Sequence, residues 1–223
     1  MKPVAVVFDA YGTLLDVHSA MQRHAGRIGP EWPALSAAWR LKQLEYSWIL
    51  SLAGPGHHRD FQALTNEALQ FVATRHGITD QTLLADLSNA YRALDAYPEV
   101  PAMLAALRRH GIATAILSNG APSMLHEAVH AAKIADLLDD VISVEQAGIF
   151  KPDPRVYRLA IDRFGGDAGH LVFVSSNPWD AFGARANGFR VVWVNRANQP
   201  DEYGLRGSTT ELPDLSALSV FLT

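Results

Sequence analysis

An aspartate at the end of an apolar segment is the first residue whose surroundings suggest chemistry. Asp9 follows the run VAVVF (residues 4–8), which has the composition of a strand buried on both faces. Gly12 allows the chain to turn sharply afterwards, so the carboxylate can face a crevice at the carboxyl end of that strand. Tyr11, and not a second acid, lies two residues further on. The pattern therefore indicates a nucleophile without a neighbouring proton donor; a solvated aspartate that only caps the strand is the alternative.

Polar residues follow two further predicted strands, and a lysine lies between them in the sequence. The clusters are residues 118–120 (SNG) and 175–177 (SSN), while Lys151 precedes a proline that opens a helix containing Tyr157. Because the carboxyl ends of parallel strands meet along one edge of a sheet, these segments should line one crevice. Lys151 would there place its ammonium beside Asp9. Serine, asparagine and glycine are common at any strand end, so the combination carries the interpretation.

The elements that must position these side chains alternate between helix and strand from Pro98 onward. Apolar residues at helical spacing or in short continuous runs predict the individual segments. Helices are expected at 100–110, 123–133, 154–164 and 179–187, and strands at 113–117, 141–144, 170–174 and 190–194. Repeated βα units of this length predict an α/β fold with a doubly wound parallel sheet covered on both faces.

Residues 17–97 contain no convincing strand pattern. Apolar residues at helical spacing predict helices at 32–52, 61–76 and 83–94, and the breaker run AGPG (53–56) ends the first of them. We therefore expect an all-helical cap subdomain at 16–97, inserted into a core domain that consists of residues 1–15 and 98–223. Residues 198–208 have the composition of a surface loop.

The composition excludes several classes of function. The chain has 223 residues, 48% of them hydrophobic, which is enough for a sizeable core. Its net charge of −4 provides no basic field for nucleic acid or an anionic membrane surface. The absence of cysteine removes disulfides, thiolate nucleophiles and cysteine-ligated metals. No secretory leader pattern precedes the first strand, so we expect a cytoplasmic enzyme that acts on a small molecule.

Five segments together resemble the haloacid dehalogenase superfamily, and within it the L-2-haloacid dehalogenases. In chain order they are DAYGT, WRLKQLEYSW, LSNG, KPDPRVY and SSNPWDAFGA. Phosphatases of that superfamily carry a second aspartate two residues after the nucleophile, and later acidic residues that help to hold magnesium. Here those positions are Tyr11, Ser175 and Asn177. The resemblance therefore implies hydrolysis without a metal or any other cofactor.

The resemblance also implies a two-step reaction. Asp9 attacks C2 of a short-chain L-2-haloacid, expels the halide with inversion and becomes an aspartyl ester. Water then attacks the ester carbonyl of Asp9 and releases a D-2-hydroxy acid. A homodimer, formed through cap helices rich in tryptophan and leucine, is a further implication.

On the halide side, the resemblance assigns Arg40 to the departing halide. Asn119 would be the partner of Arg40, and Tyr11 would line the same cradle. A surface arginine with a packed stem is the alternative for Arg40. The wall around the carbon chain of the substrate would consist of Leu44, Phe61 and Trp179, for which core packing is the alternative.

On the hydrolytic side, the resemblance groups Asp180 with Lys151, Ser175 and Asn177 to position and deprotonate the water. Lys151 would also keep Asp9 ionised, and Tyr157 would orient Lys151 or the surroundings of Asp9. Two small hydroxyl residues would hydrogen-bond Asp9 or the substrate carboxylate: Thr13 and Ser118.

Other functions stay open at the level of sequence. Residues 126–130 read HEAVH, the spacing that places two imidazoles on one helix face for zinc, but no third ligand follows at a recognisable spacing. A magnesium-dependent phosphatase of the same superfamily is the first alternative, and loss of turnover in EDTA would identify it. A non-catalytic module that binds small anions is the second.

Overall fold

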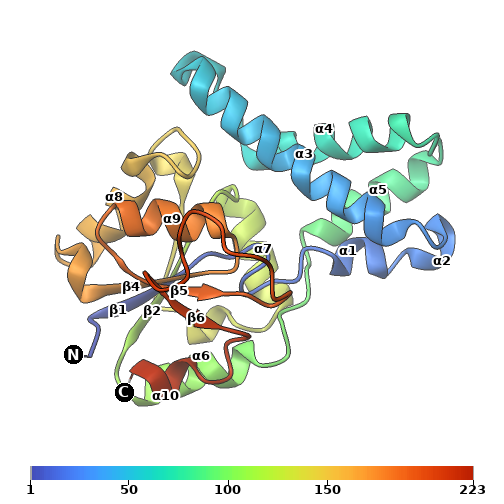
Figure 1. The fold of residues 1–223 in the computed structure, drawn as a ribbon. Coiled ribbons are helices and arrows are strands. Elements are labelled where there is room, and N and C mark those ends of the chain that lie inside the picture. The colour runs from blue at the N-terminus through green and yellow to red at the C-terminus, as the bar shows by residue number, and fades with distance from the viewer. Residues whose placement is uncertain (1, 223) are drawn as a thin grey trace.

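The computed structural model describes residues 2–222 and has a six-stranded parallel sheet at its centre (Figure 1). The strand order is β3-β2-β1-β4-β5-β6, and every neighbouring pair is parallel. The strands are β1 (Ala5–Phe8), β2 (Ala113–Ser118), β3 (Asp140–Ser143), β4 (Leu171–Ser175), β5 (Arg190–Val194) and β6 (Thr210–Leu212). The sequence order reverses at β1, because β2 and β4 lie on either side of it. This is the switch point at which doubly wound sheets bind ligands.

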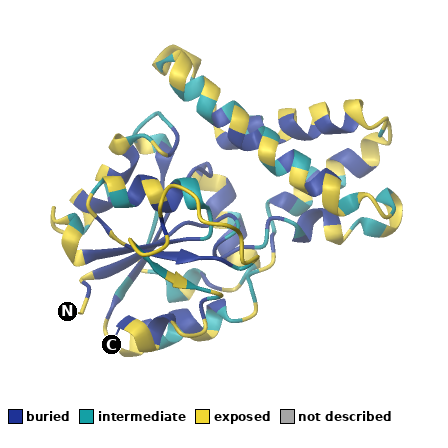
Figure 2. Cartoon of the chain, viewed as in Figure 1, coloured by how far each residue is buried: buried dark blue, intermediate teal, exposed yellow. Residues whose placement is uncertain are grey.

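Helices cover both faces of the sheet, which confirms the predicted doubly wound α/β class. In Figure 1, α8 (Pro154–Arg163) and α9 (Pro178–Ala186) lie above the sheet, and α6 (Val100–Arg109) and α10 (Leu218–Leu222) lie below it. The remaining core helix is α7 (Pro122–Ala131). All four residues of β1 are fully buried (Figure 2). Burial on both faces explains why the strand reads as a continuous apolar run.

Five helices lie beside this sheet, between β1 and α6 in the sequence (Figure 1). They are α1 (Ser19–Gln22), α2 (Ala25–Ile28), α3 (Trp32–Ala53), α4 (Phe61–Arg75) and α5 (Gln81–Tyr91). Asp60 and Asp80 cap α4 and α5 by accepting backbone N–H groups. We keep the division into a cap of 16–97 and a core of 1–15 and 98–223 as a proposal; residues 1 and 223 lie outside the described range.

The chain passes between β1 and the helices twice, and the two passages lie side by side. The Asp16 N–H donates to the carbonyl of Asp95 over 2.8 Å, and the Tyr97 N–H donates to the carbonyl of Leu14 over 3.0 Å. Arg196, which follows β5, fastens both passages. Its guanidinium donates to the Thr13 carbonyl, pairs with Glu99 over 2.6 Å and lies 3.7 Å from the centre of the Tyr97 ring. These contacts of Arg196 fix the position of the loop that follows β1.

Several element predictions were wrong or incomplete. The helix expected at 83–94 begins at Gln81, where Asp80 caps it, and ends at Tyr91. β6 and α10 were not predicted, since they have three and five residues and show no usable periodicity. The short helices α1 and α2 were missed for the same reason. The other helix and strand bounds differ from the predicted ones by a few residues at most, the usual uncertainty of element ends.

Among residues 2–222, no helix combines the length and the apolar character that crossing a membrane requires.

Candidate active site

Asp9 follows β1 directly, and three side chains hold its carboxylate. The Thr13 hydroxyl donates to Oδ2 over 3.0 Å, the Asn177 amide donates to Oδ2 over 2.7 Å, and the Lys151 ammonium donates to Oδ1 over 3.2 Å. Gly12 has a φ of 89°, so the sharp turn after Asp9 uses a backbone conformation that suits glycine. Asp9 is only 4% exposed. The carboxylate is therefore desolvated and fixed in orientation, two conditions that favour a carboxylate nucleophile.

Asn177 reaches Asp9 at the expense of its usual local role. It is the N-cap residue of α9, yet its side chain makes no capping hydrogen bond. The amide donates instead to Asp9 and to the Tyr11 carbonyl over 3.1 Å. Asparagine at this position normally bonds the first N–H groups of the helix. The diverted side chain indicates that the site, and not the helix end, determines its conformation.

A second buried carboxylate lies on the other side of Lys151. Asp180, in the first turn of α9, accepts the Lys151 ammonium over 2.8 Å and the Ser175 hydroxyl over 3.1 Å, both on Oδ2. The Tyr157 hydroxyl donates to Oδ1 over 2.7 Å. Tyr157 thus bonds the carboxylate that also holds the Lys151 ammonium, and its role in orienting Lys151 or the surroundings of Asp9 stays a prediction. A Cβ on Gly183 would collide with the Tyr157 hydroxyl, so this contact depends on a glycine in α9.

Burial changes the pKa of the Asp180 carboxyl. Removal from solvent raises the pKa of Asp180 to about 6, although the ion pair with Lys151 acts in the opposite direction. Burial also keeps the pKa of the Tyr157 phenol well above its ordinary value, so this hydroxyl stays a neutral donor. A carboxylate with such a pKa is ionised above pH 6 and can still accept a proton from water that attacks an ester.

The raised pKa of Asp180 predicts a pH-dependent second step. As the pH falls through about 6, Asp180 becomes protonated and can no longer accept a proton, so ester hydrolysis should slow about tenfold between pH 7 and pH 5. Rapid-quench mass spectrometry of the intact protein would measure the ester on Asp9. We expect more ester at pH 5 than at pH 8; equal amounts at the two pH values would contradict the role of Asp180.

Two side chains near Asp9 each carry a buried donor atom without a hydrogen-bond partner among the described residues. Arg40 of α3 donates to the Tyr11 carbonyl over 3.4 Å and hydrogen-bonds Tyr91, but its Nη1 atom is buried without a hydrogen-bond partner among the described residues. The Tyr11 hydroxyl is likewise buried and unpartnered there, and burial keeps its pKa well above the ordinary value. A guanidinium nitrogen and a neutral phenol hydroxyl that are buried without partners suit an anionic ligand, because such donors otherwise carry an uncompensated desolvation cost.

Ser118 and Asn119 hydrogen-bond backbone groups of the neighbouring loops. The Ser118 hydroxyl accepts the Gly120 N–H within its own turn, and no hydrogen bond joins it to Asp9. The Asn119 amide oxygen accepts the Lys151 N–H over 3.0 Å, so Asn119 fastens the lysine loop and has no hydrogen bond with Arg40. Both side chains are buried. Contact of Ser118 with a substrate carboxylate and of Asn119 with a halide stay predictions.

The three residues predicted to form the apolar wall, Leu44, Phe61 and Trp179, contact different groups of side chains. Phe61 is fully buried, with its ring centre 5.9 Å from that of Tyr11. Leu44 is buried on α3, one helical turn after Arg40. Trp179 packs edge-on against Trp48 at 5.5 Å. Trp48 was not singled out from the sequence, although its four-residue spacing from Leu44 repeats the spacing of Leu44 from Arg40 and could have identified it.

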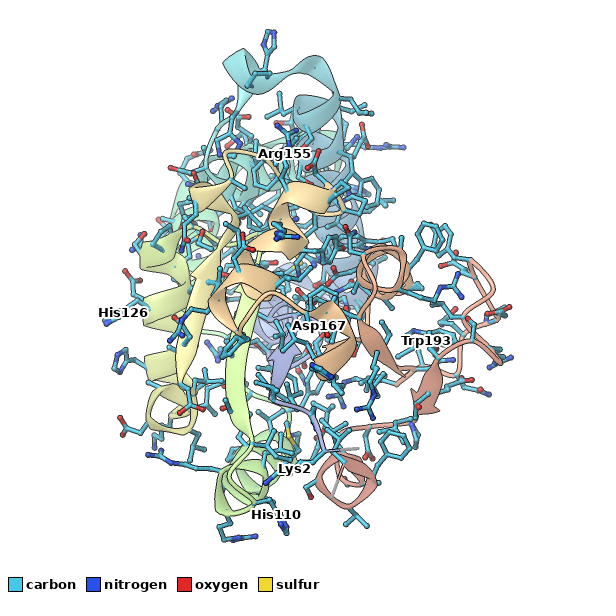
Figure 3. The ribbon with its side chains drawn as sticks, turned by 90° about the vertical axis from the view of Figure 1, so that its left-hand side faces the viewer. Lys2, His110, His126, Arg155, Asp167 and Trp193 are labelled. Atoms are coloured by element: carbon cyan, nitrogen blue, oxygen red, sulfur yellow. The ribbon has the colours of Figure 1, made fainter. Side chains whose placement is uncertain are left out.

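The donor set does not fit a magnesium ion. Two carboxylates, Asp9 and Asp180, lie at the site, and the ammonium of Lys151 bonds both of them. A cation is thus already present where a metal would need hard oxygen ligands. The zinc-like pair His126 and His130 is exposed, with Figure 3 showing His126 at the outer edge of the molecule, and no group of three metal-ligating side chains occurs within residues 2–222.

Comparisons with known proteins agree with this geometry. The family model for haloacid dehalogenase-like hydrolases matches residues 4–188. (S)-2-haloacid dehalogenase 1 of Pseudomonas sp. (strain CBS-3) is 46% identical to this chain. The alignment covers 100% of this chain and 98% of that protein.

Solved structures give the same result. A dehalogenase in an intermediate complex superposes with a TM-score of 0.95 at 43% identity, over 99% of this chain and 97% of that one. The L-2-haloacid dehalogenase of Xanthobacter autotrophicus with covalently bound chloropropionic acid superposes with a TM-score of 0.89 at 35% identity. The match covers 99% of this chain and 98% of that one. The chain therefore belongs to the haloacid dehalogenase-like hydrolases and, among them, to the L-2-haloacid dehalogenases.

Proposed function

We propose that the protein hydrolyses short-chain L-2-haloacids to D-2-hydroxy acids, with inversion at C2 and an aspartyl ester on Asp9 as the intermediate. The observation that carries the proposal is the buried Asp9 carboxylate, hydrogen-bonded by Thr13, Asn177 and Lys151. No acid follows two residues later, since that position is Tyr11. Relatives at 42–46% identity are named (S)-2-haloacid dehalogenases.

In the first step, a carboxylate oxygen of Asp9 forms a bond to C2 of the substrate. The carbon–halogen bond breaks, and the halide leaves with the bonding electron pair. Attack from the side opposite the halogen inverts C2. Arg40 and Tyr11 would receive the halide, because both have buried donors without partners among the described residues. The Lys151 ammonium would hold the nucleophilic carboxylate in place before attack.

In the second step, water attacks the carbonyl carbon of the Asp9 ester. Asp180, whose carboxylate is hydrogen-bonded by Ser175, Tyr157 and Lys151, accepts a proton of that water. The bond between the acyl carbon and the ester oxygen then breaks, the ester oxygen takes the proton from Asp180, and the hydroxy acid leaves with an oxygen atom that came from Asp9. The second proton of the water leaves the new carboxyl group for solvent. The Asp9 carboxylate is regenerated with one oxygen from water. Neither step requires an electron carrier or a metal ion.

A homodimer in the cytoplasm completes the proposal. Several large apolar side chains are exposed on the helices between β1 and α6: Leu41, Ile49, Leu52 and Phe71. Their clustering on α3 and α4 supports contact between two copies through these helices. Sedimentation of the purified chain tests the dimer. The cytoplasmic location stays a prediction from the sequence.

The test of the activity is halide release from racemic 2-chloropropionate in buffer that contains EDTA. Chiral analysis would follow both the lactate formed and the substrate left. We expect D-lactate, with consumption of the L-substrate alone. Release of phosphate from phosphate esters on addition of magnesium, without halide release, would establish the phosphatase instead.

A further inference from the structure

A cavity of about 390 Å³ lies between the end of α3, the loop before α8 and the start of α9. Its lining is mostly apolar and includes Trp48, Leu52, Ile149, Phe150, Lys151 and Trp179. Leu52, near the end of α3, is 83% exposed in the single chain, so this side of the cavity faces solvent there. At the other side is Lys151, whose ammonium bonds Asp9. The cavity therefore extends from the surface of the single chain to the lysine that bonds the nucleophile.

The cavity continues the face of α3 that carries Arg40. Arg40, Leu44 and Trp48 are spaced by four residues, which places them within one face of the helix. With a rise of about 1.5 Å per residue, Trp48 lies about 12 Å along α3 from Arg40. If the halogen of a substrate lies at Arg40, a carbon chain that extends along α3 would pass Leu44 and then Trp48 before it reaches the cavity.

Aromatic rings separate the cavity from Asp9 and Arg40. Trp48 and Trp179 pack edge to face, with ring centres 5.5 Å apart and an interplanar angle of 80°. Phe150 lines the cavity and packs against Phe61 at 6.0 Å, and Phe61 packs against Tyr11 at 5.9 Å. The Trp48 Nε1 atom is buried and has no hydrogen-bond partner among the described residues. Packing alone holds this ring, so its removal breaks no hydrogen bond.

We propose that the cavity is a subsite for the carbon chain of longer L-2-haloacids, from C4 onward, and that Trp48 sets the chain-length limit. The proposal rests on the function proposed above and adds to it the class of acid that the site can accept. A concave, mostly apolar space of this volume is typical of a small-molecule subsite. Each methylene group buried there should improve affinity about fourfold. The carboxylate and halogen of the substrate would stay beside Asp9 and Arg40.

The first measurement compares kcat/KM for 2-bromooctanoate and 2-bromopropionate in the wild type and in Trp48→Ala. We expect Trp48→Ala to raise the ratio of the two values at least tenfold. Trp48→Leu, a smaller change, should raise it by less and covers the case in which the alanine variant does not fold. Trp48→Phe keeps an aromatic ring and should leave the ratio within about twofold of the wild type.

Two further variants test the position of the chain. Adding Ile149→Trp to Trp48→Ala refills the cavity and should reverse the gain, because Ile149 lies in the lining. Glu45→Ala, the matched control on α3, removes an exposed side chain outside this lining and should not change the ratio. An unchanged ratio in folded Trp48→Ala and Trp48→Leu would overturn the proposal.

A binding measurement separates this proposal from the proposed function. Calorimetry with octanoate and propionate, which carry no halogen, needs no turnover. Trp48→Ala should bind octanoate at least tenfold more tightly than the wild type does, with propionate affinity changed by less than threefold. Absence of halide release by the wild type would count against the dehalogenase. Absence of any gain in octanoate affinity would count against the subsite.

Discussion

Asp9→Asn is expected to abolish halide release, with a fall in kcat of about 10⁵-fold or more, the scale seen when a covalent nucleophile is removed. An amide has no charge and is a far weaker nucleophile than a carboxylate. Its NH2 group would also face a donor on either side, because Thr13, Asn177 and Lys151 all donate to Asp9. Ion chromatography of halide in single-turnover and steady-state experiments measures the effect.

The matched control is Asp162→Asn, an exposed aspartate on α8 that pairs with Arg158. It should retain the full rate. Circular dichroism of both variants would show whether the fold is kept. Halide release by a folded Asp9→Asn within tenfold of the wild type would contradict the covalent mechanism. If neither wild type nor variant releases halide and both bind a 2-haloacid, the small-anion-binding module is the correct interpretation.

The same intermediate predicts where the oxygen of water goes. Because water attacks the acyl carbon of Asp9, one turnover in water enriched in oxygen-18 should label the Asp9 carboxylate and leave the hydroxy acid unlabelled. Direct attack of water on C2 would give the opposite distribution. Mass spectrometry of the peptide that contains Asp9, after a single turnover with enzyme in excess, distinguishes the two routes.

The sequence predicted the elements whose burial is uniform along their length. β1, β2, β4 and β5 are buried on both faces or nearly so, and each consists mostly of apolar residues. The long helices α3 and α4 bury one side, which gives a regular apolar spacing. β6 lies at the edge of the sheet, is three residues long and is half-exposed, so it carries no comparable pattern.

The residue types at the site were predictable, but their partners were not. A strand end and a turn identify Asp9 from local sequence. The hydrogen bond from Tyr157 to Asp180 depends on how closely α8 and α9 approach, which Gly183 permits. Arg196 bonds the Thr13 carbonyl from 183 positions away in the chain, and nothing in its local sequence indicates that contact. Such contacts depend on packing between elements.

Lys151→Met should combine a loss of activity of about 10³-fold or more with a marked loss of stability. Lys151 is 1% exposed, and its ammonium is shared by Asp9 and Asp180. Methionine fills similar space but leaves two carboxylates buried without their cation. Removing one partner of a buried ion pair costs about 3–5 kcal/mol in the free energy of unfolding. Urea unfolding at pH 8 measures that cost, and Lys42→Met, in a surface pair with Glu45, should cost less than about 1 kcal/mol.

The pH dependence of that loss identifies its cause. Asp180 already has a pKa raised to about 6, so its protonated form is favoured by the fold, and the stability that it contributes decreases as the pH rises through 6. Without Lys151, which lowers this pKa, the folded-state value rises further. The deficit of Lys151→Met in the free energy of unfolding, relative to wild type, should therefore be largest at pH 8 and smaller at pH 5.

Adding Asp180→Asn removes one of the two uncompensated charges and should restore part of the stability at pH 8 without restoring activity. A deficit that is equal at pH 5 and pH 8, and unchanged by Asp180→Asn, would mean that lost packing of the lysine stem, and not unpaired charge, destabilises the variant.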